Sequence, residues 1–281
     1  PYLHFVKGRA ALELAGMGAV TSPGELLDEA QADLEEARKL DPNDAEVYHY
    51  LAQVFVQKGK LAASAGNRSE QVAAEKQADE ILAQGIRSAP GSPEVHIHVL
   101  TRQLAVMGQG TIAAAREHMK TLEPDYESLT QQFTSSPRAF AAKAQFYSFF
   151  AAYLDRTSAA DKLDKAIAAA LQAGTLDSDS AEYVILAAGY QYRKSSIYGD
   201  GSSLETAIDL AENALALPDA QDTPGPTQIA RRLNRLSLCS LLARCCVERI
   251  LSLPDVNPTR EALLARAEGA VRQIRQLQGG G

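Results

Sequence analysis

The sequence predicts an all-α protein, built from pairs of antiparallel helices that follow one another along the chain. Two observations lead to this prediction: helical periodicity runs through most of the sequence, and one arrangement of residues recurs. Ala, Leu, Glu, Gln and Arg fill the periodic segments, while Gly and Pro collect at their boundaries. No segment shows the sustained alternation of a half-buried strand. With 281 residues, 46% hydrophobic and 22% charged, the chain is typical of a globular protein.

We expect six helix pairs. Their first helices are predicted near residues 2–16, 44–58, 93–107, 136–153, 180–194 and 227–251. Their second helices are predicted near 23–40, 69–88, 110–122, 158–173, 202–217 and 258–278. Pro23, Pro93, Pro137 and Pro258 stand at or near first-turn positions, where the missing N–H is least costly. Longer linkers are expected at 125–135 and 219–226.

The recurring arrangement has two halves. The first places an aromatic, a Leu, a small residue and a second aromatic at spacings of 3, 1 and 3. It occurs at Tyr48, Leu51, Ala52 and Phe55, again at Tyr183, Leu186, Ala187 and Tyr190, and imperfectly from Phe140. The second half, with spacings of 4, 3 and 5, occurs at Ala30, Leu34, Ala37 and Pro42 and at Ala78, Leu82, Gly85 and Pro90. Small residues let two helices approach closely, and the aromatics fill the space beside them.

These residues make the chain resemble the tetratricopeptide repeat (TPR) family. The resemblance implies a right-handed superhelical α-α solenoid of about six TPR-like pairs, which we predict as a single domain over 1–281. The approximate pairs are 1–42, 43–91, 92–125, 136–178, 179–219 and 226–278. Strict repeats have about 34 residues, whereas Tyr48, His96, Phe140 and Tyr183 are 48, 44 and 43 residues apart. We place most of the excess in extended loops between paired helices, at 59–70 and 194–203.

Catalytic motifs are weak, and we predict no enzymatic activity and no cofactor. The G-x-G-x-x-A segment at 108–113 follows a predicted helix, whereas a dinucleotide loop must follow a strand. His96 and His98 are two residues apart and point to different helix faces, so they do not form a metal site. Cys239, Cys245 and Cys246 are crowded on one helix and are better interpreted as buried small hydrophobes than as a disulfide framework.

The resemblance implies that first helices line a groove in which a segment of a partner protein binds. The polar groove positions it suggests are Glu46, His49, Gln53, Glu94, Thr101, Arg138, Gln145 and Gln191. The apolar and small ones are Val56, Ile97, Leu104, Ala141, Ser148, Ala181, Val184 and Ala188. Some members of the family grip a terminal carboxylate with Lys, Asn and Arg. Glu46, Ile97 and Gln145 stand at those positions here and disfavour that subtype, since a desolvated carboxylate needs cationic donors.

The predicted function is therefore a scaffold or adaptor for another protein. The net charge of −7 disfavours nonspecific nucleic-acid binding, and no apolar run is long enough to span a membrane. The charge is uneven: from Pro226 onward nine Arg and four acidic residues give +5, leaving −12 before them. We expect these Arg to pair with neighbouring helices or to cover a solvated surface. Two alternatives stay open, an assembly factor for a basic client and an envelope- or transporter-associated protein. A cytoplasmic location is expected, but the chain does not begin with Met, so the second alternative depends on the upstream gene.

Overall fold

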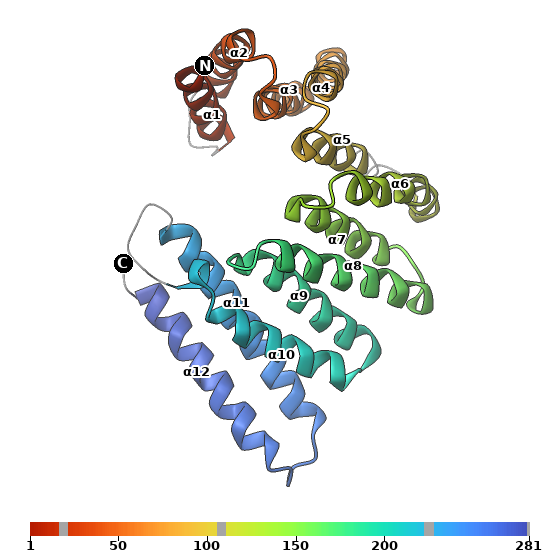
Figure 1. The fold of residues 1–281 in the computed structure, drawn as a ribbon, viewed down its shortest axis with the longest axis vertical. Coiled ribbons are helices and arrows are strands. Elements are labelled where there is room, and N and C mark those ends of the chain that lie inside the picture. Colours follow the sequence, from red (N-terminus) through yellow and green to blue (C-terminus); the bar gives the residue numbers. More distant parts are fainter. Residues whose placement is uncertain (17–21, 106–110, 222–227, 280–281) are drawn as a thin grey trace. The chain divides into compact units, whose positions relative to one another are not determined.

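The computed structural model describes residues 1–16, 22–105, 111–221 and 228–279 (Figure 1). Within these ranges the chain forms twelve α-helices and a short 3-10 helix, without a strand. The helices are α1 Tyr2–Gly16, α2 Pro23–Leu40, α3 Ala45–Ser64, α4 Arg68–Ser88, α5 Pro93–Ala105, α6 Ile112–Gln132, α7 Pro137–Ala151, α8 Arg156–Leu176, α9 Ala181–Tyr198, α10 Gly201–Leu215, α11 Gln228–Ser252 and α12 Thr259–Gly279, with η2 at Pro218–Ala220. The all-α prediction is confirmed.

The helices belong to two compact units, Pro1–Gln109 and Gly110–Gly281. Unit 1 contains α1 to α5, with α1 packed on α2, α3 on α4, and α5 against α3 and α4. In unit 2, α7 packs on α8, α9 on α10 and α11 on α12, and α6 packs against α7. The boundary falls between the helices of the predicted pair 92–125, so α5 and α6 are described with different units. That all six pairs form one domain stays a prediction.

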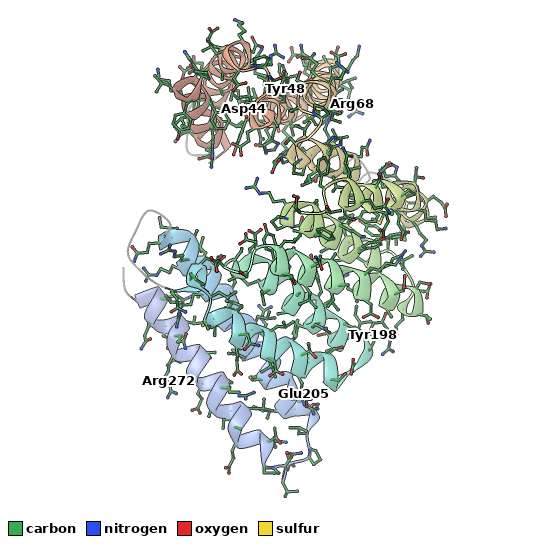
Figure 2. The ribbon with its side chains drawn as sticks, viewed as in Figure 1. Asp44, Tyr48, Arg68, Tyr198, Glu205 and Arg272 are labelled. Atoms are coloured by element: carbon green, nitrogen blue, oxygen red, sulfur yellow. The ribbon has the colours of Figure 1, made fainter. Side chains whose placement is uncertain are left out.

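Packing around Tyr48 explains the recurring arrangement (Figure 2). The Tyr48 ring is buried between α3 and α4, beside Gly85. A Cβ atom on Gly85 would lie 2.9 Å from the Cβ of Tyr48 and 3.0 Å from Cγ1 of Val95, so the site needs a residue without a side chain. The Tyr48 hydroxyl donates to the carbonyl oxygen of Pro42 at 2.8 Å and lies within hydrogen-bond distance of Oγ of Ser88, at 3.0 Å. These contacts join the start of one pair to its end, as the TPR-like repeat requires.

The expected loops at 59–70 and 194–203 are wrong, because both segments are mostly helical. α3 continues to Ser64 and α4 begins at Arg68. Between them Gly66 adopts a φ of +75°, and the side chain of Asn67 accepts a hydrogen bond from the N–H of Glu70. The second turn uses the same chemistry, a left-handed glycine followed by an Asp that caps the next helix. The extra residues therefore lengthen the helices, which is how this chain departs from a strict repeat.

The expected linker at 125–135 is also wrong, since α6 runs through Pro124 to Gln132. The part of α6 beyond the proline is held by packing, with Tyr126 and Leu129 buried. Two acidic residues of α6, on either side of Pro124, form ion pairs with neighbouring helices. Glu123 pairs with Lys162 at 2.6 Å, and Glu127 pairs with Lys143 at 2.6 Å. These tertiary contacts outweigh the local preference of proline to end a helix.

Burial would raise the pKa of the carboxyl groups of Glu123 and Glu127. The ammonium groups of the lysines bound to them instead lower each pKa below its ordinary value. Tyr147 donates from α7 to both carboxylates, at 3.1 Å to Glu123 and through a short bond to Glu127. Burial and these two carboxylates raise the pKa of Tyr147. The network therefore stays ionised at neutral pH and ties α6 to α7 and α8.

The C-terminal helices bear out the expectation for cysteines and, in part, for arginines. Cys239, Cys245 and Cys246 are free and buried. Several arginines bind acidic side chains or carbonyl oxygens of adjacent segments; these are Arg232, Arg235, Arg249, Arg260 and Arg266. Of the predicted linker 219–226, residues 222–226 lie outside the described residues.

Asp219, the first residue of the predicted linker 219–226, caps the start of a distant helix, α9. Asp219 accepts a hydrogen bond from the N–H of Ala181 at 2.6 Å, at the first residue of α9. Ser180, the residue before α9, makes no side-chain cap of its own. The helix start is therefore completed by η2, 38 residues further along.

Candidate functional site

Unit 1 presents a row of side chains across three successive first helices, α1, α3 and α5. Tyr50 of α3 meets α1, with its ring 5.4 Å from that of Phe5 and the guanidinium of Arg9 5.3 Å from its centre. His49, the preceding residue, meets α5, where its ring stacks on His98 with centroids 3.2 Å apart. The row therefore links three helices through aromatic and cationic groups, and we call it the α1–α3–α5 face.

His49, at the centre of this face, is neutral at neutral pH. Gln53 is one helical turn after His49, and its Nε2 lies 2.8 Å from Nε2 of His49. Because an amide nitrogen is only a donor, this imidazole nitrogen accepts and the ring proton is on Nδ1. Burial, reinforced by His98, lowers the pKa of His49 to about 3. At neutral pH His49 therefore offers a flat, uncharged ring that stacks on the ring of His98.

Charged groups border the α1 side of the face. Nε of Arg9 donates to Glu13 at 2.8 Å, and this bond, Tyr50 and Glu46 each raise the pKa of Arg9. Glu46 lies exposed in the first turn of α3. One arginine and two carboxylates make this edge polar with little net charge.

The predicted site residues of unit 1 are mostly accessible. Glu46, Gln53 and Thr101 are exposed, whereas His49 and Glu94 are half-buried. Glu94 accepts a hydrogen bond from Oγ of Ser92 at 2.7 Å, in the first turn of α5. The structure brings His49 and Gln53 into direct contact.

In unit 2, the predicted residues lie on two helices. Arg138 and Gln145 are exposed on α7, seven residues apart and so on one side of the helix. Phe149 continues this side, 40% exposed, with its ring centre 5.2 Å from that of Tyr153. Gln191 on α9 is half-buried and is therefore less accessible than Arg138 and Gln145. We call Arg138, Gln145 and Phe149 the α7 face.

Four of the small groove positions are buried, which the sequence argument did not expect; these are Ala141, Ser148, Ala181 and Ala188. In α9, the groove positions Ala181 and Ala188 that the family resemblance suggests are buried in contacts between helices. A side chain of α9 instead reaches α7 from Arg193, which donates to the carbonyl oxygen of Ser148 at 2.7 Å. The residues that face outward therefore stand at different positions of the repeat in α3 and in α9.

Four members of the α1–α3–α5 face were missed, namely Phe5, Arg9, Tyr50 and His98. Tyr50 had a usable signal, because it is a second aromatic two residues after the buried Tyr48 and therefore points elsewhere on the helix. The partners of Tyr50 and His49 depend on which helices are neighbours. No local pattern gives that information.

A separate cavity of about 320 Å³ lies between α4 and α5 of unit 1. Leu82, Ile86 and Val99 form its apolar lining, and Arg102 pairs with Asp79 beside them. Its volume is at the lower end for small-molecule sites. Within the described ranges no cluster of three or more His, Cys, Asp or Glu side chains could hold a metal ion. The same ranges contain no helix long and apolar enough to cross a membrane. Gly108 to Gly110 of the G-x-G-x-x-A segment lie outside them.

Comparison with known proteins identifies solved structures of low similarity. No family model and no curated protein matches the chain. A MamA double mutant is 14% identical over 74% of this chain and 96% of its own, with a TM-score of 0.37. The TPR protein TTC0263 of Thermus thermophilus is 17% identical over 79% and 99%, with a TM-score of 0.36. The S. pombe nuclear import adaptor Nro1 is 11% identical over 99% and 94%, with a TM-score of 0.45. Because these values are low, the TPR-like fold rests on the helix pairs and buried motif residues described above.

Proposed function

We propose that the protein is a non-enzymatic scaffold that binds a segment of a partner protein on the α1–α3–α5 face of unit 1, and that the α7 face of unit 2 is a separate binding surface. The observation that carries the proposal is the linked row on unit 1. Arg9, Tyr50 and His49 meet side chains of adjacent first helices, Gln53 contacts His49 within α3, and all four stay partly open to solvent. Aromatic and Arg side chains are enriched at protein interfaces.

The chemistry of the face favours an uncharged polar segment with aliphatic side chains. The neutral imidazole of His49, the ring of His98 stacked on it and the ring of Tyr50 offer flat surfaces for aliphatic groups. Gln53 offers a side-chain amide for hydrogen bonds to a peptide backbone. A partner carboxylate would meet Arg9, but Glu13 already binds that guanidinium. The face thus disfavours a strongly acidic ligand.

The experiment is an affinity pull-down from native lysate, followed by binding measurements on each recovered partner. Replacing Gln53 and Gln145 together by Ala removes one exposed amide from each proposed face. A matched control replaces Gln77 of α4 and Gln172 of α8, which are exposed glutamines on second helices. We expect at least about tenfold weaker binding for the first pair, equivalent to about 1.4 kcal/mol, and no change for the control. Unchanged binding by the first pair would show that partners use another surface.

A basic client is a second candidate, favoured by charge alone. Residues before Pro226 carry a net charge of −12, and unit 1 contains fifteen acidic residues against ten Lys and Arg. An assembly factor for a basic protein would lose affinity steeply as salt rises, because exposed charges are screened over about 8–10 Å at physiological salt. Binding that does not change between low and moderate salt would exclude this version.

A further inference from the structure

Charge is divided unequally between the first and second helices of the pairs. The first helices α3, α5, α7, α9 and α11 together carry twelve Lys and Arg residues and four acidic residues. The second helices α2, α4, α6, α8 and α10 together carry nineteen acidic residues and ten Lys and Arg residues. Each of these first helices packs against the second helix that precedes it, inside one unit. A basic set of helices therefore meets an acidic set at five junctions.

An ion pair spans each of these five junctions. The cation always lies on the first helix, and the carboxylate lies on the second helix before it. In the order of the chain, the five contacts, which we call the junction ion pairs, are Lys58 with Asp28, Arg102 with Asp79, Lys143 with Glu127, Lys194 with Asp164, and Arg249 with Glu205. The side that supplies each charge is thus the same at every junction.

The cation is the more covered partner of every junction ion pair. The cationic side chains are 17–25% exposed, whereas the carboxylate side chains are 38–74% exposed. Some of these cations also bind a second acceptor on the same second helix: Lys58 binds Gln31, Arg102 binds the carbonyl oxygen of Glu75, and Lys143 binds Thr130. Losing the carboxylate would leave a largely covered cation unpaired, which is costly. The exposed carboxylate, in turn, is within reach of dissolved ions, which screen the attraction.

We propose that the junction ion pairs determine which helices stack on one another and make the coupling between successive pairs dependent on salt. A first helix docked in another position would leave its covered cation without a carboxylate, so wrong arrangements are disfavoured. Attraction between partly exposed charges weakens as salt rises. Repeat proteins are stabilised by the interfaces between neighbouring repeats as well as by the repeats themselves. The coupling between pairs, rather than helix formation within a pair, is therefore the quantity that these charges control.

The α8–α9 junction offers the clearest test, because small residues form much of its packing. Its buried alanines include Ala169, Ala170 and Ala173 of α8 and Ala187 of α9. Alanine side chains bury little apolar area. The junction should therefore depend more strongly on Lys194 and Asp164, whose Nζ and Oδ1 atoms are 2.6 Å apart, than a junction filled by large side chains would.

Charge reversal tests this ion pair on the full chain. Lys194→Glu and Asp164→Lys each bring two like charges together, and the double variant restores an ion pair of opposite polarity. Amide exchange followed by mass spectrometry reports the protection of α9 and α10. At about 0.1 M salt we expect each single variant to lower this protection at least about tenfold, and the double variant to return within about threefold of the wild type. Lys120→Glu is the matched control, since Lys120 pairs with Glu117 of its own helix, α6, and it should leave α9 and α10 unchanged.

Salt supplies the second readout. Raising it from about 0.1 M to about 1 M shortens the screening length from about 10 Å to about 3 Å. Protection of α9 and α10 should then fall in the wild type. It should change much less in a neutral variant that combines Lys194→Met with Asp164→Leu, because that variant has no charge left to screen at this contact.

The proposal is overturned by a double variant that is no better protected than either single variant, because the two residues would then act separately through packing. It is also overturned by single variants that match Lys120→Glu, or by a wild type whose protection responds to salt no more than that of the neutral variant. If a single variant does not fold, the comparison is made by circular dichroism, and the double variant must recover the helices.

Discussion

Replacing Gly85 by Ala tests the packing that defines the repeat. The substitution adds one methyl group to α4 and changes no charge. In an exposed helix it would stabilise by about 1 kcal/mol, because Ala is a better helix former than Gly. Here the new Cβ would lie 2.9 Å from Cβ of Tyr48 and 3.0 Å from both its Cγ and Cγ1 of Val95. Packing and helix propensity therefore act in opposite directions.

The neighbours of Gly85 have little room to move. Tyr48 is 3% exposed and is held by two hydrogen bonds of its hydroxyl, and Val95 is fully buried. Overpacking in such a place costs about 1–3 kcal/mol. Subtracting the gain in helix propensity, we expect a net loss of about 1 kcal/mol and at most about 2 kcal/mol.

Gly174→Ala is the matched control. Gly174 also lies inside a helix beside a motif tyrosine, but there its Cβ would be 3.6 Å from Cγ2 of Val184 and 3.8 Å from Cβ of Tyr183. These are ordinary van der Waals distances, so the gain in helix propensity should dominate. We expect Gly174→Ala to stabilise its unit by up to about 1 kcal/mol.

Thermal unfolding followed by circular dichroism and calorimetry measures both variants. A change of 1 kcal/mol shifts the midpoint by about 4–8 °C in unit 1, which has about 100 residues, and by about 2–4 °C in the larger unit 2. The Gly85→Ala midpoint should fall, and the Gly174→Ala midpoint should stay or rise. A Gly85→Ala variant as stable as the wild type would refute the claim that close approach selects glycine at this position.

Three further predictions concern single groups. The folded pKa of His49, about 3, lies below its ordinary value of 6.5, so unit 1 should lose stability as pH falls from about 6.5 toward 3, and His49→Gln should reduce this loss in acid unfolding curves. Asp219→Ala removes the side-chain cap of α9 and should cost about 1 kcal/mol in unfolding experiments, whereas an equal stability would argue against the cap. Tyr147→Phe removes a donor from two carboxylates and should cost roughly 1–3 kcal/mol; a neutral result would mean that the lysines alone satisfy them.

The sequence predicted the fold because its signals are local. Spacing around Tyr48 and Leu34 depends on helix geometry, and α2 begins at Pro23 as expected for a proline in the first turn. Pro124 shows where local reasoning fails. Contacts of Glu123 and Glu127 with lysines of other helices keep α6 intact beyond it. Those contacts join residues 16 to 39 positions apart, and no window along the chain contains both partners.

The site was predictable only in part for the same reason. His49 and Gln53 are one turn apart on one helix, so their common face follows from spacing. The stacking of His49 on His98 and of Arg9 on Tyr50 depends on the distance between helices. In α9 the motif register pointed to Ala181 and Ala188, which are buried. The aromatic that defines the motif thus fixes helix packing more reliably than it fixes which residues face outward.

The cap provided by Asp219 makes unfolding less modular than a chain of independent pairs. Asp219 follows α10, and its side chain and carbonyl oxygen also lie within 3.4 Å of Nδ2 of Asn234 in α11. Loss of α11 would therefore release Asp219 and leave the N–H of Ala181, at the start of α9, without its acceptor. Amide exchange in the first turn of α9 should then report the integrity of α11. This hydrogen bond is thus one physical element of the coupling between neighbouring pairs on which the stability of a repeat protein depends.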